Sequence, residues 1–391
     1  MAMVKVKSRS QARPLLGIVT CRFRPDLPKR RPFGSQTRRF LGLCNDARKL
    51  GLRVVVFFAE DVDLSSDRIR GMTYSAKQRK WICKYFRYPD AIYNRVPTRT
   101  HEADERVASV LTTVQRLGIP LFNTRYLNKL EVYQVARSLP PVAAHVPDTR
   151  RLRKLQDFTS MLGKYKVVYL KLSDGTLGNG ISVVTLAGKR VLWKRNVGRK
   201  VLETTLSKRQ MDGIVAGYIE RKRYLAQQGL NLVKYKGRPL DFRVLVQKRG
   251  DGRWRVTGVG TRVAGPKQIT THVPRGGKRL SFQQGIECAV GKDPERCRDL
   301  AARIQKLCCT VAQHVERSLG LHLAEASLDI GVDTSGRTWL IEMNSKPFLF
   351  DEKVIQAKAR RYILEYARRV ININNARRTN ATPAEVRGNA V

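Results

Sequence analysis

The stretch "LDIGVDTSGRTWLIEMNSKPF", residues 328–348, consists of two apolar runs on either side of the polar segment DTSGR. β-branched and aromatic residues are frequent in both runs, and this pattern predicts the two strands of a β-hairpin. A turn centred between Ser335 and Gly336 would place Asp329 directly opposite Glu342. Carboxylates that face each other across two strands repel, so a cation between them would remove a cost to the hairpin.

The second predicted strand carries Asn344 on the same face as Glu342, because side chains two residues apart in a strand point the same way. Carboxylate and amide oxygens suit Mg²⁺, which in proteins usually shares its coordination shell with water and phosphate oxygens. The residues alone leave two interpretations open. Asp329, Glu342 and Asn344 form a metal site, or they are exposed charges on an edge hairpin.

The length and composition describe a globular chain. Its 391 residues, 42% of them hydrophobic and 7% aromatic, suffice for two or three domains with a large core. No apolar run approaches the roughly 20 residues of a membrane span. The N-terminal segment lacks a small-residue cleavage site, which argues against a signal peptide. Seven scattered cysteines without a C-x-x-C motif argue against a disulfide framework or a zinc site, and they indicate a reducing cytosol.

The charge is strongly basic, with 76 Lys and Arg against 32 Asp and Glu and a net charge of +44. Such a surface attracts polyanions. The basic residues are spread along the whole chain, however, and no zinc-finger, helix-turn-helix or RNP motif is present. Nucleic acid is therefore not expected to be the main partner.

The pattern of apolar residues changes along the chain. Residues 1–14 are basic and are expected to be disordered. Predicted strands and helices alternate over residues 15–122, which favours a parallel sheet flanked by helices. From residue 123 onward the pattern is mixed, with several strands predicted from "GYIERKRYLAQQ" onward. Residues 371–391 are expected to form a flexible tail.

A glycine-rich turn follows a strand lysine in "VVYLKLSDGTLGNGISVV", residues 167–184. Glycine lets the backbone approach phosphate oxygens, and Lys171 would add a positive charge. The order of residues matches neither a Walker A loop nor a Rossmann fingerprint. A phosphate-binding turn and a hairpin tip with a solvated Lys171 both remain open.

Arginines mark two further predicted strands. In "PLDFRVLVQK", Asp241 and Arg243 share a face. Such an arginine can bind a phosphate or carboxylate in bidentate fashion while the aspartate orients it, and a surface ion pair is the alternative. The segment "GTRVAG" adds Arg262. Arg95, in "YNRVPTRT", is expected to be a solvated loop arginine.

The order of these motifs resembles the ATP-grasp superfamily. The resemblance is closer to the YheC/YheD family of endospore coat-associated proteins, and it runs from about residue 15 to about residue 369. It is carried by "NKLEVYQ", "VPDT", "LKLSDGTLGNGI", "YLAQQGLNLVKYKGRPLDFRVLVQK", "VTGVGTRVAG" and "LIEMNSKP".

This resemblance implies an N-terminal pre-ATP-grasp α/β domain over residues 15–122. An ATP-grasp domain of two α+β subdomains would follow over residues 123–370. The nucleotide-binding subdomain would cover about 123–230, and the metal-binding catalytic subdomain about 231–370.

The resemblance also implies roles for individual residues. The residues that would bind the phosphates, the phosphate-covering loop and the adenine of ATP are Lys129, Lys171, Ser173, Gly175, Gly178, Gly180, Gln227, Gln228 and Leu230. Those that would hold Mg²⁺, with Mn²⁺ as an alternative, are Asp329, Glu342 and Asn344. Arg243 and Arg262 would contact the γ-phosphate or an acyl phosphate, with Asp241 beside them.

ATP-grasp relatives typically convert a carboxylate to an acyl phosphate, which an amine or another nucleophile attacks. The resemblance therefore implies an ATP- and Mg²⁺-dependent carboxylate–amine ligase. Its substrates would be an amino acid, a peptide or an anionic polymer. Two other classes stay open: a non-catalytic, nucleotide-binding scaffold with spore coat proteins as partners, and a polyanion- or nucleic-acid-binding protein. The expected location is the mother-cell cytoplasm of a spore former, or the spore coat.

Overall fold

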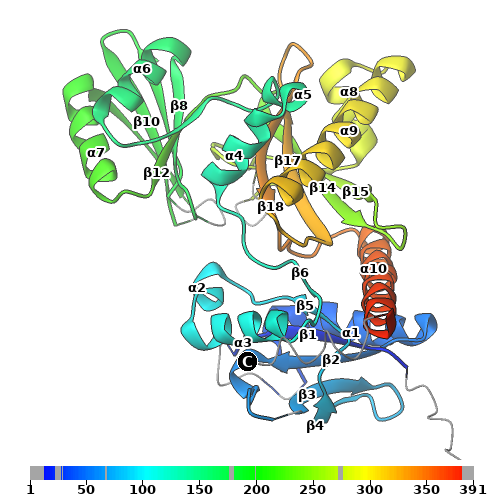
Figure 1. The fold of residues 1–391 in the computed structure, drawn as a ribbon. Helices are drawn as coiled ribbons and strands as arrows, with labels where there is room; N and C mark the ends of the chain where they lie inside the picture. The colour runs from blue at the N-terminus through cyan, green and yellow to red at the C-terminus, as the bar shows by residue number, and fades with distance from the viewer. Residues whose placement is uncertain are drawn as a thin grey trace, which may run out of the picture.

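Three six-stranded sheets organise the molecule in the computed structural model, each with its own hydrophobic core (Figure 1). The structure describes residues 13–22, 28, 30–66, 68–175, 180–198, 200–271 and 276–380. None of the helices in these ranges combines the length and the apolar composition of a membrane span.

The first sheet, with strand order β4-β3-β2-β1-β5-β6, belongs to the N-terminal domain. Its parallel strands are β1 (Leu15–Thr20), β2 (Arg53–Phe58), β5 (Ala91–Asn94) and β6 (Leu121–Phe122). The prediction of parallel strands is confirmed for these four. An antiparallel hairpin, which the alternation of strands and helices does not predict, extends the sheet beyond β2: β3 (Arg68–Ser75) and β4 (Lys80–Arg87).

Helices cover both faces of this first sheet. Side chains alternate between the two faces along β1, so α1 (Thr37–Ala47) packs against Leu16 and Ile18, and α3 (Glu105–Arg116) packs against the opposite face. The short helices of the domain are η1 (Gly34–Gln36), η2 (Arg48–Leu50), η3 (Ala59–Asp61) and α2 (Arg99–Glu102).

The second sheet, with strand order β11-β10-β9-β8-β12-β7, is antiparallel throughout. Its strands are β7 (Thr149–Arg151), β8 (Val167–Leu172), β9 (Ser182–Ala187), β10 (Arg190–Val197), β11 (Lys200–Ser207) and β12 (Tyr224–Gln228). Two helices complete its core, α6 (Leu155–Tyr165) and α7 (Lys208–Glu220). The segment "GYIE" thus ends a helix that Ser207 caps, and the strand predicted there starts only at Tyr224.

The third sheet has the order β16-β15-β14-β17-β18, with β13 paired to β14. Its strands are β13 (Lys234–Tyr235), β14 (Arg238–Lys248), β15 (Trp254–Val263), β16 (Lys278–Leu280), β17 (Glu325–Val332) and β18 (Thr338–Asn344). The helices in its core are α4 (Lys129–Ser138), α5 (Pro140–Ala143), α8 (Phe282–Val290) and α9 (Pro294–Ser318). Hydrophobic residues between 127 and 146, in the stretch that the resemblance assigns to the nucleotide-binding subdomain, pack in the core of the third sheet.

The predicted hairpin is formed by β17 and β18, and Asp329 lies opposite Glu342. The turn is centred on Ser335, slightly earlier than predicted, and Gly336 adopts a φ of 81°, which favours glycine. A bulge at Ile341 adds one residue to β18 and restores the predicted pairing.

The last helix, α10 (Lys353–Asn380), connects the N-terminal domain with the third sheet (Figure 1). Ile363, Leu364 and Ile371 pack on the first sheet, and Ile355 contacts Leu245 of β14. The helix continues past residue 370, where the sequence predicts a flexible tail. Residues 371–380 are helical, and Ile371 at the start of this extension is buried.

Candidate active site

The β17–β18 hairpin separates its polar residues from the core. Leu328 and Met343 are buried on one face, whereas the side chains of Asp329 and Glu342 on the other are 15% and 27% exposed. Asn344 lies two residues beyond Glu342 and is also partly exposed. The three predicted metal ligands therefore occupy one face, as strand alternation requires.

Arg262 of β15 connects the carboxylates of two neighbouring strands. Its Nε and Nη2 donate to Asp241 at 2.8 and 2.7 Å, and Nη2 also lies 2.9 Å from Oδ2 of Asp329. Thr271 donates a further hydrogen bond to Asp241 at 2.5 Å. Burial disfavours the guanidinium charge, but Asp241 and Asp329 outweigh it and raise the pKa of Arg262. The sequence predicts that Asp241 orients Arg243, because both lie on β14 with their side chains on one face. In the structure Asp241 orients Arg262 instead.

Arg243 stays without a carboxylate in ion-pair contact among the described residues. It lies opposite Asp329 in the β14–β17 pairing, and its guanidinium lies 5.4 Å from the centre of the Phe350 ring. Its Nε is buried and has no hydrogen-bond partner within the described ranges. Burial lowers the pKa of Arg243 below its ordinary value. Arg243 therefore has donor capacity that an anionic ligand could use.

Lys171 is 6% exposed, not solvated, and its hydrogen-bond acceptors among the described residues are neutral. Its Nζ donates to the hydroxyl of Tyr133 at 2.6 Å and to Oε1 of Gln227 at 2.8 Å. Burial and the charge of Lys129 lower the pKa of Lys171 to about 7, while Glu342 acts in the opposite direction. Tyr133 was not predicted here, although it lies one helical turn from Lys129 on the same face of α4.

Lys129 is the first residue of α4, and it connects the glycine-rich turn with the β17–β18 hairpin. It is 8% exposed, its Nζ donates to the carbonyl of Gly175, and the same atom lies 3.6 Å from Oε1 of Glu342. The backbone N–H of Lys129 donates to the carbonyl of Ser173 at 3.3 Å. The glycine-rich turn thus contacts α4 next to the hairpin. Gly180, at its far end, has a φ of 68°, and the predicted Gly178 lies outside the described residues.

The predicted adenine-binding residues Gln227, Gln228 and Leu230 lie at the end of β12 and just beyond it. Gln227 is 6% exposed and bridges Lys171 to Thr149, to which its Nε2 donates at 2.8 Å. The side-chain oxygen of Gln228 accepts from the backbone of Asp148 at 3.2 Å. Leu230 follows Gly229, where a Cβ would lie 2.5 Å from a methyl carbon of Val167. The side chain of Gln227 therefore points to Lys171.

The N-terminal domain is anchored beside the hairpin through Glu325, at the start of β17. Oε1 of Glu325 accepts from Tyr93 at 2.5 Å and Arg95 at 3.1 Å, and it lies 3.4 Å from Arg39. The carbonyl of Pro347, just after β18, also accepts from Arg39 at 2.9 Å and from Arg95 at 3.1 Å. Arg95 is 6% exposed, so the expectation of a solvated loop arginine is wrong.

The donor set on the hairpin fits a hard divalent cation. It offers two carboxylates and one amide, without a thiol or imidazole, and this chemistry suits Mg²⁺ or Mn²⁺ better than zinc. Within the described part of the chain, no group of three or more His, Cys, Asp and Glu side chains forms a candidate metal site. A cation held by Asp329, Glu342 and Asn344 would therefore rely on water or ligand oxygens for the rest of its shell.

Residues 118–370 match the family model described as YheC/D like ATP-grasp. The chain belongs to this family. Two relatives are from Bacillus subtilis (strain 168). Endospore coat-associated protein YheD is 27% identical over 85% of this chain and 72% of its own length, and endospore coat-associated protein YheC is 22% identical over 78% and 83%.

Solved structures share the ATP-grasp fold. The D-alanine–D-alanine ligase of Coxiella burnetii is 11% identical, with a TM-score of 0.53 over 94% of this chain and 97% of its own. D-alanyl-alanine synthetase A of Vibrio cholerae is 9% identical, with a TM-score of 0.51 over 94% and 100%. The first sheet and the two later sheets therefore form an ATP-grasp arrangement.

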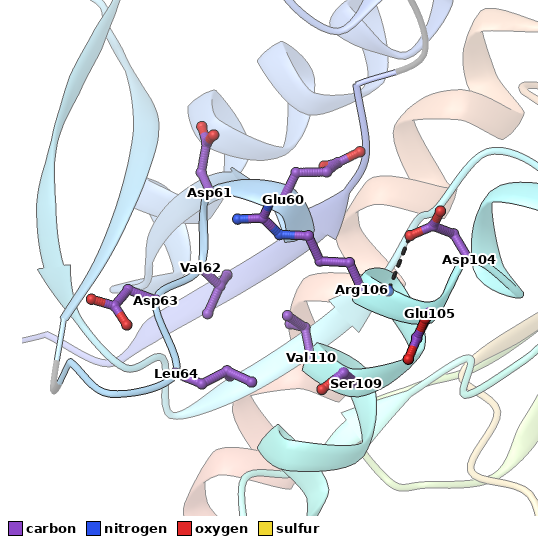
Figure 2. A pocket seen from close by; sticks show the side chains of 10 residues that line it. All are labelled: Glu60, Asp61, Val62, Asp63, Leu64, Asp104, Glu105, Arg106, Ser109 and Val110. Carbon is purple, nitrogen blue, oxygen red and sulfur yellow. Dashed lines mark hydrogen bonds between the residues drawn. The ribbon is translucent and has the colours of Figure 1, made fainter.

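A separate pocket of about 770 Å³ lies in the N-terminal domain (Figure 2). It is lined by Glu60, Asp61, Val62, Asp63, Leu64, Asp104, Glu105, Arg106, Ser109 and Val110. Several of its acidic side chains already have local structural roles: Asp104 caps α3, Asp61 pairs with Arg22, and Asp63 accepts from Ser65. The pocket shares no residue with the cluster around Lys171 and Glu342.

We expect Lys171 to take up a proton when a nucleotide binds. At about pH 8 a lysine with a pKa of about 7 is mostly neutral, and a bound phosphate would raise that pKa and protonate it. The enthalpy of Mg·ATP binding should then differ between buffers of different ionisation enthalpy, with a slope approaching about one proton. Lys171→Met should remove this dependence, and the exposed-lysine variant Lys189→Met should keep it. Equal enthalpies in both buffers for the wild type would contradict the assignment.

Proposed function

We propose that this ATP-grasp protein is an ATP- and Mg²⁺-dependent ligase that joins a carboxylate to an amine through an acyl phosphate. The observation that carries the proposal is Lys171. Among the described residues the hydrogen-bond partners of this buried lysine are neutral oxygens, so its positive charge is costly unless an anion approaches it. The opposed carboxylates of Asp329 and Glu342 lie beside it, joined through Lys129.

The several positive charges of the site suit the multiply charged phosphate groups of a nucleotide better than a singly charged anion. Lys129 and Lys171 provide two buried cations, and the backbone carbonyls of Ser173 and Gly175 accept hydrogen bonds from Lys129 beside them. Arg243 adds a third cation from β14. Phosphoryl transfer is catalysed mainly by positioning and by neutralising charge on the transferred group, and this set of side chains supplies both.

The metal would be held by Asp329, Glu342 and Asn344. When bound, Mg²⁺ neutralises charge on the β- and γ-phosphate oxygens. Arg262 pairs with Asp329 at 2.9 Å and with Asp241 through two hydrogen bonds. If Asp329 served as a metal ligand, Asp241 would still hold the guanidinium of Arg262 in place.

The proposed reaction has two steps. A carboxylate oxygen of the substrate forms a bond to the γ-phosphorus, and the bond from that phosphorus to the β,γ-bridging oxygen breaks, so ADP leaves with the electron pair. Arg243 and Arg262 would stabilise the transferred group. The amine then attacks the acyl carbon, phosphate leaves, and the amine nitrogen releases a proton. No side chain of the chain forms a covalent bond in either step.

The biological setting is proposed from the relatives. Both are named endospore coat-associated proteins, so we place the activity in the mother-cell cytoplasm or in the spore coat. An amino acid, a peptide or an anionic polymer would serve as substrate, and a net charge of +44 favours an acidic one.

ADP release tests the proposal. Calorimetric titration should first show ATP binding that requires Mg²⁺. Adding amino acids or acidic peptides to Mg·ATP should then increase ADP release, with one phosphate formed for each amide bond. Mg·ATP binding without ADP release in any mixture of carboxylate and amine would favour a nucleotide-binding scaffold. No ATP binding at millimolar concentration would overturn the proposal.

A further inference from the structure

Arg99 brings a cation from the N-terminal domain to the candidate active site. It starts the short helix α2, which lies beneath the start of α4 (Figure 1). Its Nη2 donates to the carbonyl of Leu127, two residues before Lys129. The guanidinium lies 5.3 Å from the centre of the Tyr126 ring. These contacts hold Arg99 next to the residue that links the glycine-rich turn to Glu342.

The charge of Arg99 is not matched by a contacting carboxylate among the described residues. Glu102, on the same helix, is already engaged: it pairs with Lys346 and accepts from the side chain of Asn94 at 3.0 Å and the backbone of Tyr126 at 2.7 Å. Nε of Arg99 is buried and has no hydrogen-bond partner within the described ranges. Arg99 therefore keeps donors available for a further acceptor.

The charge of Glu342 favours the charged form of three cations that have no contacting carboxylate among the described residues: Arg99, Lys171 and Arg243. Asp174 of the glycine-rich turn also favours the charge of Arg99. Each of these cations belongs to a different part of the fold. Lys171 lies on β8 of the second sheet and Arg243 on β14 of the third sheet, and both are proposed to bind phosphate. Arg99 belongs to the N-terminal domain.

We propose that Arg99 binds the carboxylate group of the substrate that accepts the γ-phosphoryl group. This inference rests on the proposed ligase activity. A guanidinium binds a carboxylate through two parallel N–H···O bonds, and the contact with the Tyr126 ring uses none of the N–H donors of Arg99. The N-terminal domain thereby presents the carboxylate oxygen to the phosphorus, and the same contact holds the acyl oxygen once the acyl phosphate has formed.

The test compares two small anions that differ by an acyl group. Acetyl phosphate and inorganic phosphate are titrated separately into the full chain saturated with Mg·ADP. Both present phosphate oxygens to the site, and acetyl phosphate alone presents an acyl oxygen to Arg99. The variants are Arg99→Gln, which removes the charge, and Arg99→Lys, which keeps the charge but loses the bidentate geometry. Arg116→Gln, at an exposed position of α3, is the matched control.

The wild type and Arg116→Gln are expected to bind acetyl phosphate more tightly than phosphate. Arg99→Gln should weaken acetyl phosphate binding by about tenfold, in line with the loss of a charged hydrogen bond, and Arg99→Lys should fall between. The affinities for phosphate and Mg·ADP should change less than about twofold. A wild type without preference for acetyl phosphate would overturn the inference, as would an equal loss for both anions. Failure of the wild type to bind Mg·ADP would instead contradict the proposed function.

Discussion

Replacing Glu342 with glutamine is expected to remove the Mg²⁺-dependent part of ATP binding and to lower ATP turnover by at least about 100-fold. The metal contributes several kcal/mol of charge stabilisation, and each tenfold in rate corresponds to about 1.4 kcal/mol. Glu342 pairs with Asp329 across the hairpin, so its loss leaves a single carboxylate beside Asn344. Calorimetric titration of ATP with and without Mg²⁺ measures the effect on binding, and ADP release measures turnover.

The same substitution should leave the fold intact, which separates a binding effect from a folding effect. Removing one of two opposed carboxylates relieves their repulsion, although it also removes the 3.6 Å contact with Lys129. The unfolding free energy without ligand should therefore change by no more than about 1 kcal/mol. Asp299→Asn, on the exposed surface of α9, is the control for carboxylate loss. Glu342→Gln that still binds ATP more tightly with Mg²⁺ would refute the metal assignment.

Glu325→Ala is expected to be the most destabilising substitution among the ion pairs. It leaves the buried guanidiniums of Arg39 and Arg95 without their carboxylate, and breaking a buried ion pair typically costs about 3–5 kcal/mol. Gln247 also loses the acceptor of its 3.1 Å hydrogen bond. Urea unfolding measures the change in free energy.

An exposed pair provides the comparison for Glu325. Glu203, 52% exposed, pairs with Lys194 at 2.9 Å, and Glu203→Ala should cost no more than about 1 kcal/mol. Glu325→Gln should be milder than Glu325→Ala, because an amide oxygen still accepts from Tyr93 and Arg95. If Glu325→Ala cost as little as Glu203→Ala, the buried network would not hold the N-terminal domain beside the hairpin.

Much of the site could be predicted from local pattern. The pairing of Asp329 with Glu342 follows from strand alternation and one turn, and the bulge at Ile341 preserves it. The placement of Lys171 near the end of a strand, before a glycine-rich turn, likewise follows from neighbouring residues in the sequence. These features depend on residues close together in the chain, where propensity and periodicity act directly.

The partners of these residues could not be predicted in the same way. Asp241 shares a face with Arg243, yet it bonds to Arg262 of the adjacent strand. Lys171 finds Tyr133 on a helix from the core of a different sheet. Sequence pattern does not encode which strands become neighbours or how deeply a cation is buried, because both depend on packing between distant segments.

Sequence pattern was sufficient to predict the β17–β18 hairpin and the cationic and acidic residues available for the site, and the resemblance of the motifs predicted the ATP-grasp family. The balance of charge among these residues depends on contacts between segments that are distant in the chain. Arg95 became a buried anchor because Glu325 lies within 3.1 Å of it, whereas Arg99, four residues later, kept free donors because Lys346 already occupies Glu102. Electrostatic pairing depends on the distance between two charges and on their burial. Both quantities follow from how the three sheets pack against one another.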